Sequence, residues 1–152
     1  MRRLGPDNDF AALHALLAAS FAYMEGRIDP PSSLTRMTAE TLSTEAREKE
    51  IWVIEDGART IACMILTPHV DTLYLGKLAT DPARRREGLA RRMFAQAEMR
   101  AKALGLPSIT LQARVELTEN HATFAAMGFE KTDETAHEGY ARPTSYTFTK
   151  RL

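Results

Sequence analysis

The sequence has very little cysteine and no excess of either charge. Cys63 is the only cysteine among 152 residues, so an internal disulfide is excluded, and its apolar setting "IACMIL" indicates a small buried hydrophobe. Lysine and arginine number 20, aspartate and glutamate number 20, and the formal net charge is zero. A chain without net charge has no overall electrostatic attraction to anionic surfaces, so we expect neither a nucleic-acid nor a membrane partner. The lone cysteine favours a cytoplasmic location.

Long apolar runs and common ligand motifs are also missing. No window approaches the roughly 18 apolar residues that a membrane helix needs, and the amino-terminal "MRRLGPDNDF" lacks the apolar segment of a secretory signal. The four histidines show no metal-ligand spacing, and no G-x-S-x-G elbow indicates a serine hydrolase. The length suits one domain over residues 1–152, and we expect no metal.

The hydrophobic pattern predicts two helices, three strands, a long helix and then a mixture of strands and a helix. Helical periodicity begins at Phe10, is weaker over 39–50 and is strongest from Gly88 to Leu104, while 26–38 reads as a long loop. Further strands and a short helix are expected at 51–55, 61–66, 72–80, 108–113, 119–127 (the helix), 128–132 and 144–149. An α/β (α+β) fold with a mixed sheet and helices on both faces accounts for this order.

Two details of the strands follow from turn chemistry and side-chain parity. Asp56-Gly57 supplies the positive φ angles of a tight hairpin turn between the first two strands. In "TLYLGKLAT", Leu73 and Leu75 share one face of a strand, whereas Leu78 has the wrong parity. One extra residue near Gly76-Lys77, a β-bulge, would bring all three leucines to one face.

The most unusual segment is "DPARRREGLARR", residues 81–92, which has five arginines around a helix start. A nucleic-acid interface is disfavoured because the chain is neutral and the segment has no aromatic residue. Arginines that are merely solvated would lie unfavourably beside the positive end of the helix dipole. An anion explains them better, since free first-turn amides around Gly88 and arginine side chains can both bind a phosphate. Neither an ATP P-loop nor G-x-G-x-x-G is present.

Three motifs in register resemble those of the GNAT superfamily of acetyl-CoA-dependent N-acetyltransferases. "RREGLA", residues 85–90, matches Q/R-x-x-G-x-G/A, "KLATDPARR" resembles the strand end L-A-V-D-P, and "FAAMGF" resembles Y-x-x-x-G-F. The resemblance spans residues 73–129. It implies a mixed, mostly antiparallel twisted sheet of about six to seven strands with helices on both faces. It also implies acetyl-CoA as co-substrate and direct transfer of acetyl to an amine.

The resemblance further implies where acetyl-CoA binds. The cofactor would lie between the strand that ends at Thr80 and the strand 108–113, with its pantetheine arm along the first strand and its pyrophosphate on the amides after Arg85. Asn120 is added because it follows a strand that borders the cleft. The cofactor-binding residues expected are Leu78, Ala79, Thr80, Arg85, Arg86, Glu87, Gly88, Leu89, Ala90, Arg91, Asn120 and Phe124.

The usual proton donor of the family is missing. Many members have a tyrosine four residues before the Gly-Phe pair to protonate the leaving thiolate, and here that position is Phe124. Tyr74 and Tyr140 are the alternative catalytic candidates. Because a thiol is a tolerable leaving group, we expect an active enzyme, and a catalytically weak acyl-CoA-binding or regulatory module is the alternative.

The acceptor is left open by the sequence. A small amine, an antibiotic, an amino acid and a protein amine are all compatible with the resemblance, and a homodimer is a possible assembly. Acidic residues at the cleft would favour a cationic amine, and the candidates are Glu25, Asp29, Glu134 and Glu138. We expect most of these four to be solvated surface residues.

Overall fold

The computed structural model describes residues 1–152, with side chains for 1–33 and 36–152. Its strands are β1 (Arg2–Leu4), β2 (Glu50–Asp56), β3 (Arg59–Pro68), β4 (Leu73–Thr80), β5 (Ser108–Arg114), β6 (Glu130–Thr135) and β7 (Ser145–Arg151). Its α-helices are α1 (Ala11–Met24), α2 (Ala39–Glu48), α3 (Leu89–Ala103) and α4 (Thr118–Ala126), with short 3-10 helices η1 (Ser33–Arg36) and η2 (Pro82–Arg84). None of the helices in these described residues is both long and apolar enough to cross a bilayer.

All seven strands form one sheet in the order β1-β2-β3-β4-β5-β7-β6. Every neighbouring pair is antiparallel except β4 and β5, which are parallel. The expected mixed, mostly antiparallel sheet is therefore confirmed. The edge strand β1 was not predicted, because three residues are too few to show an alternating pattern.

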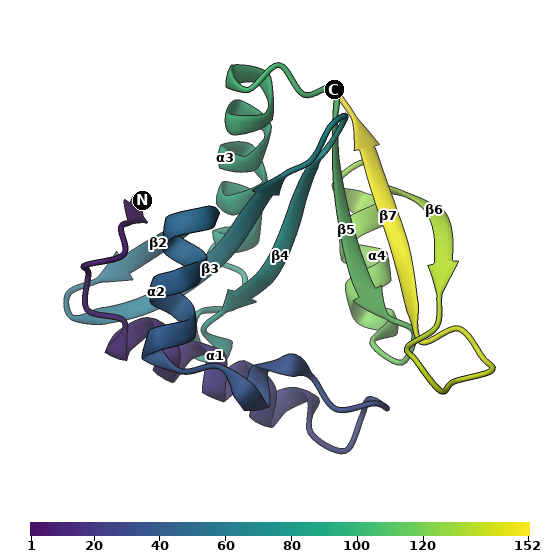
Figure 1. The fold of residues 1–152 in the computed structure, drawn as a ribbon, viewed down its shortest axis with the longest axis horizontal. Helices are drawn as coiled ribbons and strands as arrows, with labels where there is room; N and C mark the ends of the chain where they lie inside the picture. The colour runs from purple at the N-terminus through teal and green to yellow at the C-terminus, as the bar shows by residue number, and fades with distance from the viewer.

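Helices cover both faces of the sheet, as predicted (Figure 1). One buried cluster joins α3 and α4 to the sheet through residues such as Met93, Phe94 and Phe124. The second joins α1 and α2 to the opposite face through residues such as Leu13 and Leu42. The sheet therefore lies between two layers of helices, with one hydrophobic core on each of its faces.

Local sequence explains where the main helices begin and end. Thr38 caps α2 in a capping box with Thr41, in which each side chain bonds the other residue's backbone N–H. The helix α3 begins after Gly88 and ends before Gly105, whose φ of 72° is in the left-handed region that glycine favours. Leu104, the last residue of the predicted helical period, is the C-cap of α3, and its side chain is exposed because the helix leaves the sheet there.

The β2–β3 hairpin differs from prediction by one residue. Asp56 still belongs to β2, and the loop consists of Gly57 and Ala58. Only Gly57 has a positive φ, 60°. One left-handed residue at the first loop position is enough for a tight turn, so Gly57 alone supplies the positive φ that the Asp56-Gly57 pair was expected to supply.

Candidate active site

The candidate site begins where β4 and β5 separate. The two strands pair only at Leu73 with Ile109 and at Tyr74 with Thr110. Beyond these pairs the strands diverge, and Figure 1 shows the V that they form, with its apex beside the C-terminus. The edge of β4 that faces β5 therefore has backbone N–H and C=O groups without strand partners after Tyr74.

A bulge distorts β4 inside this V. Cys63 pairs with Ala79 while Ile65 pairs with Gly76, so β4 uses one more residue than β3 over the same stretch. The extra residue is accommodated at Lys77, whose φ is 51°. Leu78 consequently packs in the same core as Leu73 and Leu75. The bulge predicted from leucine parity is thus confirmed.

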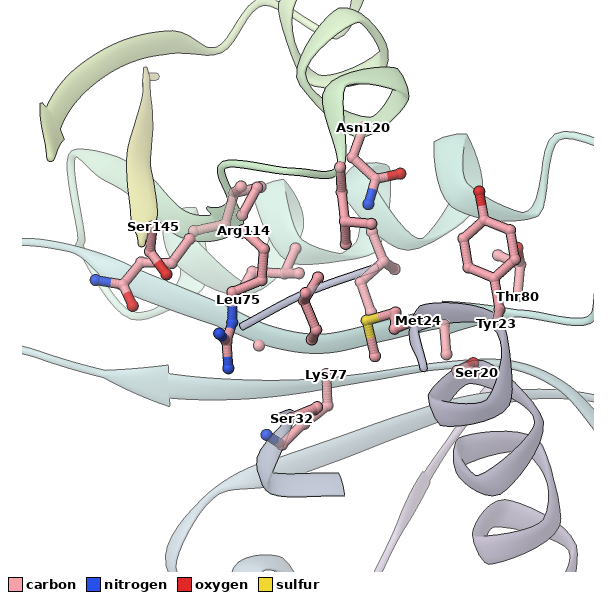
Figure 2. Close-up of a pocket in the computed structure, with 18 of the residues that line it drawn as sticks. Ser20, Tyr23, Met24, Ser32, Leu75, Lys77, Thr80, Arg114, Asn120 and Ser145 are labelled. Carbon is pink, nitrogen blue, oxygen red and sulfur yellow. The ribbon is translucent and has the colours of Figure 1, made fainter. Parts of the chain in front are cut away.

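A cavity of about 640 Å³ fills the opening of the V. Its walls include residues of α1, the segment after it, β4, β5, α3 and α4. Figure 2 shows its polar side chains in two groups, with Tyr23, Asn120 and Thr80 at one end and Arg114 and Lys77 at the other. The cavity is large enough for a sizeable small-molecule ligand, and polar groups at each end can orient it.

The turn before α3 has the geometry of an anion site. Arg86 and Gly88 have positive φ angles of 68° and 75° and alternate with Glu87, which does not. Such alternation turns successive N–H groups to one side of the chain, and the first-turn amides of α3 have no helical partner. Arg84 does not join this site, because its guanidinium is bound 2.7 Å from both Glu87 Oε2 and Asp56 Oδ2.

A model of the acetyltransferase (GNAT) family matches residues 10–129, which include the V, the bulge and the turn before α3. The chain belongs to this family. The resemblance seen in the motifs is confirmed, and the protein is a GNAT N-acetyltransferase that uses acetyl-CoA, with an amine as acceptor. No curated protein matches the sequence significantly.

Solved structures agree on the GNAT fold. The PaiA N-acetyltransferase of Thermoplasma acidophilum, in complex with coenzyme A, superposes with a TM-score of 0.82 at 15% identity over 99% of this chain and 97% of that one. An acetyltransferase of Streptococcus agalactiae gives 0.74 at 18% identity over 99% and 98%. A GNAT acetyltransferase of Elizabethkingia anophelis, with acetyl-CoA bound, gives 0.71 at 14% identity over 99% and 96%.

The predicted cofactor residues fall into two places in this GNAT protein. Those that line the cavity are Leu78, Ala79, Thr80, Arg85, Ala90, Asn120 and Phe124. Arg86, Glu87 and Gly88 form the exposed turn before α3, and Arg91 lies exposed in its first turn. Leu89 has its side chain in the core, so only its backbone can contribute to a phosphate site.

Phe124 is a packing residue that also reaches the cavity. It is buried on α4, and its ring packs against Phe94 at 6.1 Å, Phe129 at 6.4 Å and Phe148 at 5.6 Å between centroids. Three rings around one position explain why an apolar residue is stable there. It brings no hydroxyl to the site.

The two tyrosine candidates have different surroundings. Tyr74 lines the cavity on β4, and burial raises the pKa of its hydroxyl. Tyr140 lies outside the cavity lining, and its hydroxyl donates to Asp29 Oδ1 at 2.6 Å. The geometry places Tyr74, and not Tyr140, at the candidate site.

Several lining residues were not predicted as site residues. Tyr23 of α1 donates its hydroxyl to Glu119 of α4 at 2.7 Å and lowers the pKa of that carboxyl to about 2, together with Arg27. Lys77 and Arg114 also line the cavity. Arg114 ends the strand that borders the cleft, so its position was the signal that could have identified it.

Proposed function

We propose that this N-acetyltransferase holds acetyl-CoA across the V and transfers its acetyl group directly to an amine that enters from the α1–α2 face. The observation that carries the proposal is the loss of strand pairing after Tyr74 and Thr110, which leaves the β4 edge free beside a cavity of about 640 Å³. A pantetheine arm has amide groups of its own. It can therefore pair with the backbone of Leu78–Thr80 as a short additional strand.

The turn before α3 would hold the pyrophosphate. The amides of Arg86–Ala90 are the donors, and the positive φ angles at Arg86 and Gly88 support this assignment. Arg85 lines the cavity and stacks its guanidinium 5.2 Å from the Tyr23 ring centroid, which keeps it beside the expected phosphate path. Arg91 supplies a second, exposed charge. Asn120 and Phe124 border the pantetheine.

The transfer needs one proton to leave the amine and one to reach sulfur. The neutral amine nitrogen attacks the thioester carbon and the C–N bond forms, after which the nitrogen loses one proton to solvent. The C–S bond breaks, and the thiolate takes up one proton and leaves as CoA. Because Phe124 has no proton to donate, we assign the donor role to Tyr74. Burial raises the pKa of its hydroxyl, so the group stays protonated at neutral pH and can donate to the thiolate.

Calorimetry with acetyl-CoA and a CoA-release assay over an amine panel test the proposal. We expect binding and release of free CoA with at least one acceptor. Failure to bind at high micromolar concentration would contradict the cofactor site. Binding without CoA release from any amine would favour the alternative, an acyl-CoA-binding module, which Phe124 in place of a hydroxylated residue supports.

We also propose a single-domain organisation and a cytoplasmic location. A single domain over residues 1–152 is supported by the one continuous sheet and by the core on each face. A cytoplasmic location is supported by Cys63, a free thiol that is buried and donates to the Lys77 carbonyl at 3.3 Å. Burial raises the pKa of this thiol to about 12, so it serves as a core residue and not as a nucleophile.

A further inference from the structure

The end of the cavity opposite Tyr23 is rich in positive charge. Lys77, Arg114 and Arg36 all line the cavity, and Figure 2 shows Lys77 and Arg114 at this end of it. Lys77 bonds Ser33 Oγ at 2.5 Å, and Arg114 donates to the Pro30 carbonyl at 2.7 Å. Both cations thus contact the segment between α1 and α2, on the side from which we propose that the acceptor enters.

Lys77 and Arg114 are both partly buried, and Arg114 acts electrostatically on Lys77. Burial lowers the pKa of Lys77, and the positive charges of Lys49, Arg114 and Arg36 lower it further, against the opposing effect of Glu45. Burial also lowers the pKa of Arg114, against the opposing effects of Glu116, Tyr140 and Asp29. Partly desolvated like charges are unfavourable unless an anion or other compensation is present, so this end of the cavity is set up to accept negative charge.

Carboxylates of the protein do not supply that charge within the cavity. Among the described lining residues Glu119 is the only acidic one, and it is bound at the other end by Tyr23 and by Arg27, 2.7 Å away. The acids that act electrostatically on Lys77 or Arg114 lie outside the lining. Glu45 pairs with Lys49, and Asp29 bonds Tyr140 and Arg142. Glu116 Oε2 accepts from the Asp29 N–H, whereas its Oε1 is buried without a hydrogen-bond partner.

The same lining argues against a cationic acceptor site. Glu25, Asp29, Glu134 and Glu138, the acids that could have favoured a cationic amine, all lie outside the cavity lining. An acceptor with extra positive charge would meet Lys77 and Arg114 instead. The donors still available are two N–H groups of Lys77 and those guanidinium N–H groups of Arg114 that do not bond the Pro30 and Pro31 carbonyls.

We propose that the acceptor is an amine that also carries an anionic group, a carboxylate or a phosphate, which Arg114 and Lys77 bind together. The amine would then project toward the thioester beside the bulge. Arginine binds either anion in bidentate fashion, and lysine adds a point charge. This inference rests on the proposed function and specifies the substrate class of the same site.

Matched acceptor pairs test the inference. The panel consists of L-amino acids with their primary amides, and phosphoethanolamine with ethanolamine, so that the two arms distinguish carboxylate from phosphate. We expect at least one anionic member to show a kcat/KM for CoA release at least tenfold above that of its neutral partner. In Arg114→Gln and Lys77→Met this preference should fall to about twofold or less, mainly through KM. Arg92→Gln, an exposed arginine of α3 outside the cavity lining, is the control and should keep the preference.

A binding measurement keeps the inference separate from the proposed function. Calorimetry with acetyl-CoA alone tests the cofactor site in wild type and in each variant, and thermal unfolding reports whether Arg114→Gln disturbs the Pro30 contact. Calorimetry of N-acetyl-amino acids, N-acetylphosphoethanolamine and their neutral counterparts in the presence of CoA requires no turnover. Tighter binding of the anionic products, lost in both variants, supports the inference. Equal binding, preference for the neutral member, no binding of any product, or a preference that survives in both variants overturns it.

Discussion

At the scale of single residues, the proposed proton transfer depends on Tyr74, the tyrosine of β4. Tyr74 lines the cavity, and Tyr74→Phe removes its hydroxyl while it leaves the ring in place. We expect kcat to fall by about 10²- to 10⁴-fold, the usual contribution of a positioned acid. CoA-release kinetics measure it, and thermal unfolding should show little change.

The pH profile adds a second readout for Tyr74. Burial raises the pKa of its hydroxyl above the ordinary value of 10.0, so the donor form persists as pH rises through neutrality, and the wild-type rate should decline from this group only above about pH 10. The phenylalanine variant should lack that decline. Tyr140→Phe is the matched control, because its hydroxyl bonds Asp29 outside the cavity, and it should keep kcat within about threefold. A large loss in Tyr140→Phe with none in Tyr74→Phe would reverse the assignment.

At the scale of elements, the turn before α3 can be tested through its glycine. Gly88 has a φ of 75°, and a Cβ there would meet no atom within 4 Å, so Gly88→Ala acts through backbone strain and not through a clash. The left-handed conformation costs a non-glycine residue roughly 1–2 kcal/mol. Because relief of that strain would move the amides of Arg86–Ala90, we expect the Kd for acetyl-CoA to rise about tenfold, which is about 1.4 kcal/mol.

Gly57→Ala provides the comparison for Gly88→Ala. Gly57 has a φ of 60° in the β2–β3 hairpin, and a Cβ there also meets nothing within 4 Å. Both variants should lose a similar amount of unfolding free energy in denaturant titrations. Calorimetry should show weaker acetyl-CoA binding only for Gly88→Ala. Equal affinities in the two variants would mean that the turn does not hold the cofactor.

Elements with a clear local sequence pattern could be predicted, whereas side-chain contacts between residues far apart in the sequence could not. The helical period of α3, the hairpin glycine and the β4 bulge each follow from local spacing or parity, and the structure confirms them. The contacts that shape the acceptor end join Lys77 to Ser33 and Arg114 to Pro30, which are 44 and 84 positions apart. Such contacts depend on how the tertiary fold places the segment between α1 and α2 over the V. No local sequence pattern predicts this placement.

At the scale of the whole molecule, the sheet consists of two halves with a weak connection. β1–β4 form one half and β5–β7 the other, and each is joined internally by extended antiparallel ladders. Between them only two residue pairs connect β4 and β5, at the apex of the V in Figure 1. The side-chain bond from Tyr23 of α1 to Glu119 of α4 crosses the open end. A ligand that pairs with both walls would therefore add the connection that the sheet lacks.

Acetyl-CoA should consequently stabilise the fold as a whole, and the effect should be concentrated at the two walls. At a concentration about 100 times Kd, ligand binding contributes about 2.7 kcal/mol, which for a chain of this size raises Tm by about 5–10 °C. Hydrogen exchange should slow at the β4 amides beyond the bulge, at the facing amides of β5 and in the turn before α3. Pantetheine alone, which lacks the pyrophosphate, should protect the strands weakly and leave the turn unchanged. Protection by acetyl-CoA that is confined to the turn, with unchanged exchange along β4 and β5, would show that the cofactor does not bridge the V, and the pantetheine assignment to Leu78–Thr80 would then be wrong.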